Sequence, residues 1–251
     1  MKDVPFTFGI ITDHTRELSS HLPKIIQSIK DLNIPEYEIL IVGDESQLKQ
    51  KEYYNDIKVI HFVGKPGWIT KQKNLITQHA KYENIVYQHD YIYYDKDWYE
   101  GFKAFGDNFD VCMNKIKNQD GTRFRDHVIF PWHHCYPISY DICKRSKALW
   151  DNCGIENNET MLPYDENRFI KLQYISGSYW VAKKKVMQEF PLDESLMWSQ
   201  GEDCVWSMNV LTKYNFSMNA NSTVHFDKMK ADAFGLFKPE VLRKCVKFIS
   251  K

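Results

Sequence analysis

The feature that most constrains the fold is a regular alternation of short apolar runs with amphipathic stretches over the first hundred residues. Apolar side chains recur with helical spacing over 18–32 and again over 69–81, and short apolar runs flank both stretches. Because strands that alternate with helices pair in parallel through right-handed crossovers, we predict an α/β fold with a mostly parallel sheet flanked by helices. The predicted strands are FTFGII (6–11), YEILIV (37–42), IKVIHF (57–62) and NIVYQ (84–88).

The second half of the chain is less regular. Residues 131–170 combine Pro, Asn, Cys and aromatic residues with weak periodicity, which predicts an inserted irregular region. No internal repeat or low-complexity linker interrupts the chain, so we expect one domain over 1–251. The other elements predicted here are strands over 110–116 and 122–130, two short strands around 176–178, a helix starting near 202, a strand over 216–226 and an amphipathic helix over about 237–249.

Charge and hydropathy exclude several classes of partner. The 33 basic and 33 acidic residues cancel, which argues against nucleic acid as the main partner. No run of about 18 apolar residues predicts a transmembrane segment, and the first residues show no signal-peptide pattern. We therefore expect a cytoplasmic protein, with peripheral attachment to a membrane as the alternative. Aromatic residues reach 15%, and such rings either fill the core or line sugar and base sites.

The six cysteines are scattered along the chain, and none forms a C-x-x-C pair. In a reducing compartment we interpret them as free thiols. His133, His134, Cys135 and Cys143 offer the ligand types of a zinc site. Their spacing matches no zinc pattern, so packing within a loop is the favoured interpretation.

Three carboxylates follow the ends of predicted strands. Asp13, Asp44 and Asp90 come directly after the first, second and fourth of these runs. Ligands of open α/β sheets bind beyond the carboxyl ends of the strands, so the three acids are expected to lie along one rim. Clustered acids repel one another unless a cation lies between them. A divalent ion that carries a diphosphate is the usual solution, since Mg²⁺ and Mn²⁺ prefer oxygen ligands and share their coordination with phosphates.

Asp90 is the best candidate for a metal ligand at this rim. His89 precedes it, and His225 in the last predicted strand offers a second imidazole. Imidazole ligands favour Mn²⁺ over Mg²⁺. Two alternatives remain open, namely that Asp90 caps the following turn and that His225 is a packing residue.

The order of several short motifs resembles the GT-A nucleotide-sugar glycosyltransferases, in particular the inverting family-two-like group. The likeness spans about 6–227, with 101–170 matched only loosely. The segments that carry it are FTFGIITDHTRELSSHLPKIIQSI (6–29), YEILIVGDES (37–46), GWITKQKN (67–74), VYQHDYIYYDKDWYEGF (86–102), the 175–206 stretch that ends in GEDCVW, and STVHF (222–226).

Two positions depart from the motifs of that group. The place of its D-x-D motif reads His89-Asp90-Tyr91, so only the middle acid is present. Gly43 stands where an acid is common, which leaves Asp44. These differences bear on which residues hold a metal.

The resemblance implies roles for residues on both sides of a cleft. It implies a nucleotide-binding half over about 1–100 and an acceptor-binding half over about 101–230. Asp203 is implied as the general base, with Glu202 and Trp198 contacting the acceptor. The residues implied to bind the nucleotide-sugar are Thr12, Asp13, Asp44, Lys73, Asn74 and Asp90.

Simpler structural roles compete with these assignments. Ser199-x-x-Glu202 has the form of a capping box, which explains Glu202 without a ligand but does not explain Asp203. Asp13 has the position of a helix cap. Lys73 can instead belong to the exposed face of the predicted 69–81 helix.

The leading functional hypothesis is an inverting glycosyltransferase that moves a sugar from a UDP- or GDP-sugar to a hydroxyl of a glycan, with Mn²⁺ or Mg²⁺. A non-catalytic module that binds nucleotide-sugars or glycans is the first alternative. A sugar nucleotidyltransferase is the second, and it is disfavoured because the turn after the first strand lacks the glycines that cradle a triphosphate.

Overall fold

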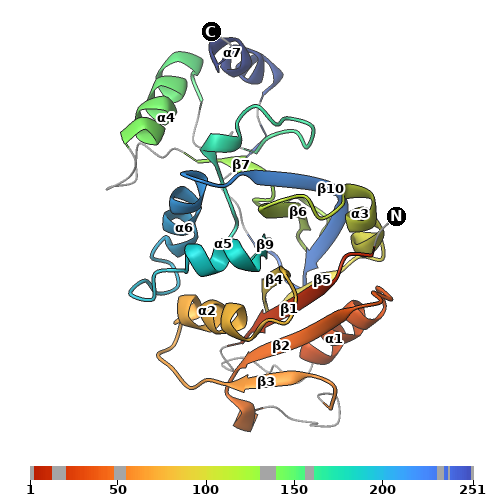
Figure 1. Ribbon diagram of the computed structural model, residues 1–251. Coiled ribbons are helices and arrows are strands. Elements are labelled where there is room, and N and C mark those ends of the chain that lie inside the picture. Colours follow the sequence, from red (N-terminus) through yellow and green to blue (C-terminus); the bar gives the residue numbers. More distant parts are fainter. Residues whose placement is uncertain are drawn as a thin grey trace.

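The computed structural model describes residues 3–12, 21–47, 55–130, 140–155, 161–230, 235–236 and 238–249 (Figure 1). Its centre is a curled sheet of eight strands in the order β3-β2-β1-β4-β9-β6-β10-β5. The strands are β1 (Phe6–Ile11), β2 (Tyr37–Gly43), β3 (Lys58–His61), β4 (Asn84–His89), β5 (Ile92–Tyr94), β6 (Val111–Lys117), β9 (Tyr179–Lys183) and β10 (Phe216–Phe226).

The first four strands form the parallel part of the sheet, as the alternation predicts. β1 pairs in parallel with both β2 and β4, and β2 pairs in parallel with β3. In the second half β9 runs antiparallel to β4 and β6, while β10 is parallel to β6 and antiparallel to β5. The register of β1 and β4 places Ile11 opposite His89, so these two strands end side by side.

Helices cover both faces of the sheet, and the side chains of each strand alternate between two apolar clusters. Phe8 of β1 and Ile41 of β2 belong to the cluster under α1 and α3, whereas Leu40 and Val42 belong to the cluster under α2, α5 and α6. The helices are α1 (His21–Lys30), α2 (Ile69–His79), α3 (Trp98–Phe105), α4 (Tyr140–Cys153), α5 (Lys184–Glu189), α6 (Glu202–Leu211) and α7 (Pro239–Ile249).

The region predicted to be irregular contains a long helix. α4 occupies 14 residues within 131–170 and packs beside α7 at one end of the molecule (Figure 1). Its buried positions Ser146, Leu149, Trp150 and Cys153 have helical spacing, but a serine and a cysteine weaken the apolar signal. Residues 131–139, which include His133, His134 and Cys135, lie outside the described residues.

Three further details differ from the sequence predictions. The predicted strand over 122–130 is reduced to β7 (Val128–Ile129), which pairs with β8 (Gln173–Tyr174) in a separate two-stranded sheet. The short strand β5 was not predicted. The capping-box prediction for Ser199 is wrong, because α6 begins after Gly201 in a left-handed conformation (φ 74°) and has no side-chain cap.

Two expectations about the whole chain also have outcomes. The four cysteines whose state is described, Cys112, Cys153, Cys204 and Cys245, are free thiols, as predicted. Among the helices that the structure describes, none combines the length and the apolar character needed to span a membrane.

Candidate functional site

The ends of β1 and β4 bring two of the sequence-predicted residues into direct contact. Thr12 Oγ1 donates a hydrogen bond of 2.7 Å to Asp90 Oδ2, and both residues are buried. The side-chain amide of Gln72 in α2 donates to the backbone oxygens of Thr12 and Val42. Parallel pairing therefore fixes Asp90 at the sheet edge, and one carboxylate oxygen is oriented by a neutral hydroxyl.

A cavity of about 350 Å³ opens above these strand ends. Its lining includes Thr12, His89 and Asp90 from the strand ends, and Trp198, whose residue surface is 67% exposed. The described residues that line it are Ile11, Thr12, Pro66, Gly67, Ile69, Gln72, His89, Asp90, Tyr91, Trp198, Lys228 and Lys230. Residues that are far apart in the sequence thus share one hollow, which holds an acid, an imidazole, two lysines and an exposed ring.

Lys228 and Lys230 are charged residues of the described lining that the sequence analysis missed. Lys230 Nζ donates to Ser178 Oγ at 2.6 Å and to Tyr91 Oη at 2.8 Å. Lys228 Nζ lies 3.7 Å from the centroid of the Tyr91 ring. The signal available in the sequence is the spacing in HFDKMK, where two lysines follow the last strand two positions apart.

Burial and like charges shape the titration of this wall. Burial, followed by repulsion from Lys228, Arg125 and Lys73, lowers the pKa of Lys230 to about 7. Burial, followed by repulsion from Lys73, Lys230 and Lys228, lowers the pKa of His89 well below its ordinary value. The His89 ring is therefore neutral at pH 7 and can act as a ligand or a hydrogen-bond partner, but not as a cation.

The Gly177–Ser178 turn connects Asp203 to the lining of this cavity. Its Oδ2 accepts a hydrogen bond of 2.8 Å from Gly177 N, and Ser178 in turn contacts Lys230 of the cavity lining. A Cβ on Gly177 would lie 2.8 Å from Asp203 Oδ2, so a side chain at position 177 would displace the Asp203 carboxylate. Asp203 is half-buried and does not point away into bulk solvent.

Glu202 is buried beside Asp203 at the start of α6. Burial, together with repulsion from Asp203, raises the pKa of the Glu202 carboxyl. Two adjacent acids therefore differ in exposure, and Asp203 is the more accessible of the pair.

Lys73 and Asn74 are not among the described residues that line the cavity, but they hydrogen-bond segments next to it. Lys73 is fully buried, donates to Gly177 O at 2.7 Å and lies 4.6 Å from the centroid of the Trp180 ring. Asn74 bonds both the backbone N–H and the backbone oxygen of Leu192. Together with Trp198, whose N–H bonds Gly67 O, these contacts fasten the loop before α6 to the start of α2.

Asp44 and His225 are also absent from the described lining of the cavity. Asp44 accepts hydrogen bonds from the backbone and hydroxyl of Ser46 and is not in the lining. His225 Nε2 lies 2.8 Å from Asp95 Oδ1, and its ring stacks on Tyr93 rather than facing Asp90. Asp13 lies outside the described residues.

The donors present fit a divalent ion only in a complex with substrate. Within the described ranges, no group of three or more His, Cys, Asp and Glu side chains is arranged to hold a metal. Asp90 and the neutral His89 offer two ligands. An ion of the Mg²⁺ or Mn²⁺ type that keeps water and binds substrate phosphates needs no more than one or two from the protein.

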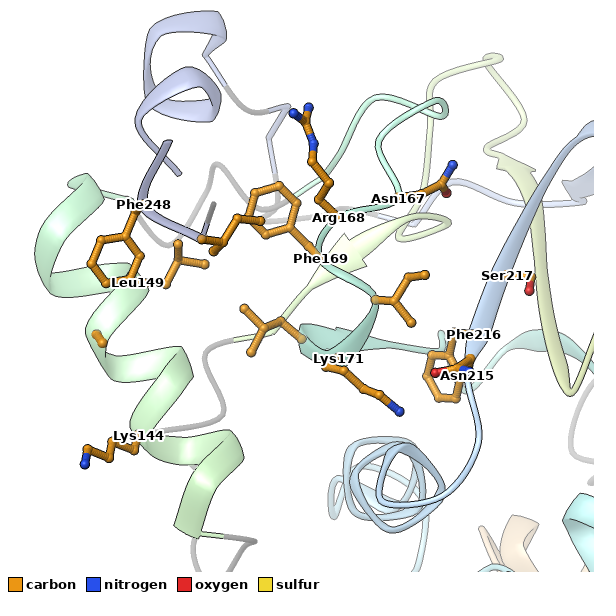
Figure 2. Close-up of a pocket in the computed structure, with 14 residues that line it drawn as sticks. Lys144, Leu149, Asn167, Arg168, Phe169, Lys171, Asn215, Phe216, Ser217 and Phe248 are labelled. Carbon is orange, nitrogen blue, oxygen red and sulfur yellow. The ribbon is translucent and has the colours of Figure 1, made fainter. Parts of the chain in front are cut away.

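A larger cavity of about 1100 Å³ lies elsewhere, between α4, α7 and the segment before β8. Figure 2 shows Phe248 and Leu149 at one end of it and Asn215 and Phe216 at the other. Its lining contains no Asp, Glu, His or Cys, so it offers no general acid, base or nucleophile of those types. The smaller cavity, which Asp90 and His89 line, is therefore the better candidate for a catalytic site.

No model of a known protein family matches this sequence, and no protein of curated function matches it by sequence. Solved structures do match. S. aureus TarS superposes over 98% of this chain and 64% of its own, with a TM-score of 0.58 and 16% identity. TarS in complex with UDP-GlcNAc superposes over 98% of this chain and 66% of its own, with a TM-score of 0.55 and 16% identity. GalNAc-T7 with UDP, GalNAc and Mn²⁺ superposes over 98% of this chain and 47% of its own, with a TM-score of 0.58 and 14% identity.

These likenesses confirm the predicted fold, a GT-A-like mixed α/β architecture with helices on both faces of the sheet. The chain spans less than two thirds of the length of TarS and of GalNAc-T7. At 14–17% identity the likeness concerns the fold, and function has to be argued from the cavity itself.

Proposed function

We propose that this chain is an inverting glycosyltransferase that transfers a sugar from a nucleoside-diphosphate sugar to a hydroxyl of a glycan. The observation that carries the proposal is the cavity at the ends of β1 and β4, which Asp90 and Trp198 both line, with Asp203 bonded to the neighbouring Gly177. Open α/β sheets bind ligands at this edge. The structural neighbours with UDP and UDP-GlcNAc support a UDP-sugar as the first donor to test.

In this proposal Asp203 is the general base. Its carboxylate takes the proton of the acceptor hydroxyl while the hydroxyl oxygen attacks the anomeric carbon, and the bond from that carbon to the diphosphate oxygen breaks. Proton transfer by a positioned group contributes about 10²- to 10⁴-fold in rate. The hydrogen bond from Gly177 N orients the carboxylate for this step. Attack from the face opposite the leaving group inverts the anomeric configuration.

The other residues have binding roles in the proposal. Thr12 orients Asp90, and Trp198 offers an exposed ring on which a sugar can stack. Asp90 and His89 would hold Mn²⁺ or Mg²⁺ together with the donor phosphates. When bound, such an ion supplies Lewis-acid stabilisation of the departing diphosphate. Asp13 and Asp44 remain candidates for the base and ribose, and Glu202 for the acceptor.

Release of nucleoside diphosphate tests the proposal. The full chain, incubated with a panel of UDP- and GDP-sugars and Mn²⁺, is expected to release UDP or GDP slowly from one of them, and faster with a glycan acceptor. Nuclear magnetic resonance of the product should show inversion at the anomeric carbon. Retention would refute the role of Asp203 as base while leaving glycosyl transfer intact.

A non-catalytic binding module is the second candidate, and the single acid in His89-Asp90-Tyr91 favours it. It makes a different prediction for the same experiment. Thermal-shift stabilisation by a nucleotide-sugar, without release of nucleoside diphosphate under any condition, would establish binding and refute catalysis. A ligand at a hundredfold excess over its dissociation constant stabilises the fold by about 2.7 kcal/mol, which such an assay detects readily.

A further inference from the structure

The two lysines of the cavity are not explained by the acid-based roles above. Lys228 and Lys230 line the same hollow as Asp90 and follow the last strand of the sheet. Neither belongs to the motifs that suggested the function. Two lysines that lie two residues apart, at a site otherwise predicted to hold a metal, need a physical reason.

The contacts of Lys230 describe an ammonium group held ready for an anion. Its hydrogen-bond acceptors are two neutral hydroxyls, those of Ser178 and Tyr91. Within the part of the chain that the structure describes, no carboxylate lies within ion-pair distance of Lys230. An ammonium carries three N–H donors, and the two hydroxyls take two of them. One donor is therefore left for a ligand.

Aromatic rings hold both ammonium groups in place. Lys230 Nζ lies 4.7–5.1 Å from the ring centroids of Tyr91, Phe124 and Phe226. Lys228 Nζ lies over the same Tyr91 ring at 3.7 Å. Cation–π contacts restrict the long side chains without neutralising their charge. Tyr91 therefore brings the two ammonium groups together at the rim of the cavity.

We propose that Lys228 and Lys230 form a clamp for the diphosphate of the donor, and that the clamp binds a nucleoside diphosphate even without a divalent ion. This inference rests on the proposed function and names the residues that carry the leaving group's charge. Lysine is a point-charge phosphate binder, and its hydrogen bonds to phosphate are charge-assisted. The clamp explains how one acid in the place of D-x-D can suffice, because Asp90 no longer has to anchor the diphosphate through a metal alone.

Calorimetric titration tests the clamp with three probes, UDP, GDP and inorganic pyrophosphate, each in EDTA and in Mn²⁺. The wild-type chain is expected to bind UDP or GDP in EDTA. Lys230→Met and Lys228→Met should each weaken that binding about 10- to 100-fold, the range for loss of a charge-assisted hydrogen bond. Lys230→Arg, which keeps the charge, should retain more of the binding than Lys230→Met.

Two controls separate the clamp from a folding defect. Lys147→Met removes the same charge from an exposed position on α4 and should bind like wild type. Thermal unfolding midpoints identify any variant that fails to fold, and Lys228→Met then serves in place of Lys230→Met because the described lysine bond to Ser178 comes from Lys230.

The possible results distinguish the clamp from the proposed function. Binding of UDP only with Mn²⁺, or binding with wild-type affinity by both methionine variants, overturns the clamp and leaves the glycosyltransferase proposal intact. Lysine-dependent binding of pyrophosphate by a chain that binds neither UDP nor GDP supports the anion site and overturns the proposed function. Failure to bind all three probes in both buffers overturns both.

Discussion

At the scale of single residues, Lys73 shows how a buried charge can serve the wall of a site. The side chain has no exposed surface, and its ammonium joins α2 to Gly177, the residue that bonds Asp203. Burial, opposed by the attraction of Glu202 and Asp203, lowers the pKa of Lys73 to about 8. A buried protonated lysine lowers the free energy of unfolding at neutral pH, and this cost disappears when the ammonium loses its proton at higher pH.

The pH dependence of stability tests this account of Lys73. The pKa of Lys73 is about 8 in the folded chain, and an ordinary lysine, as in the unfolded chain, has a pKa of 10.5. Between these two pH values the unfolded chain binds more protons than the folded chain, so the free energy of unfolding rises with pH. Lys73→Met removes the contribution. The free energy of unfolding of wild type, relative to Lys73→Met, is expected to rise by up to about 3 kcal/mol between pH 7 and pH 10.

Urea unfolding of both proteins at the two pH values measures this difference, with the exposed Lys147→Met as a matched control. A wild-type advantage that is constant or falls with rising pH would show that Lys73 is not a buried cation.

At the scale of elements, the site depends on how the loop before α6 is fastened to α2. Asn74 bonds both backbone groups of Leu192, much as a neighbouring strand would, and Thr70 and Trp68 bond the backbone oxygens of Leu196 and Glu194. This loop carries Trp198, whose N–H bonds Gly67 O. The resemblance assigns Asn74 to the nucleotide-sugar, whereas the structure gives it a role in positioning the cavity wall.

Asn74→Ala tests that role. The substitution leaves two buried backbone groups of Leu192 without partners, and we expect a loss of about 2–4 kcal/mol in the free energy of unfolding. Amide hydrogen exchange at 192–198 should become faster, because the loop opens without global unfolding. Asn152→Ala, which removes an exposed bond to the backbone of α4, is the control and should change little. Unchanged exchange at 192–198 would refute the fastening.

The strands and helices of the first hundred residues could be predicted because their apolar residues follow one period each. β1, β2, β4 and α2 lie within one or two residues of the predicted bounds. α4 was missed because its buried face includes Ser146, which apolar patterning does not count. Neighbouring residues did not reveal which side chains face the cavity. The contacts of Lys73, Asn74 and His225 come from partners elsewhere in the sequence, and local patterns carry no record of them.

At the scale of the whole molecule, the order of the strands assembles the site. β1 and β4 are neighbours although Thr12 and Asp90 lie 78 positions apart in the chain. The antiparallel β9 follows directly, so Gly177 and Ser178 before it reach the same edge and bring Asp203 and Lys230 with them. The account predicts a division of labour, in which the Asp90 side binds the donor and Asp203 acts on the acceptor.

The most direct test of this division measures donor binding and turnover together in Asp90→Asn and Asp203→Asn, by calorimetry and by release of nucleoside diphosphate. Asp203→Asn is expected to bind the donor within about threefold of wild type while its turnover falls by about 10²- to 10⁴-fold. Asp90→Asn should lose at least about tenfold in donor affinity in the presence of Mn²⁺. Wild-type turnover by Asp203→Asn, or equal losses of affinity in the two variants, would contradict the account.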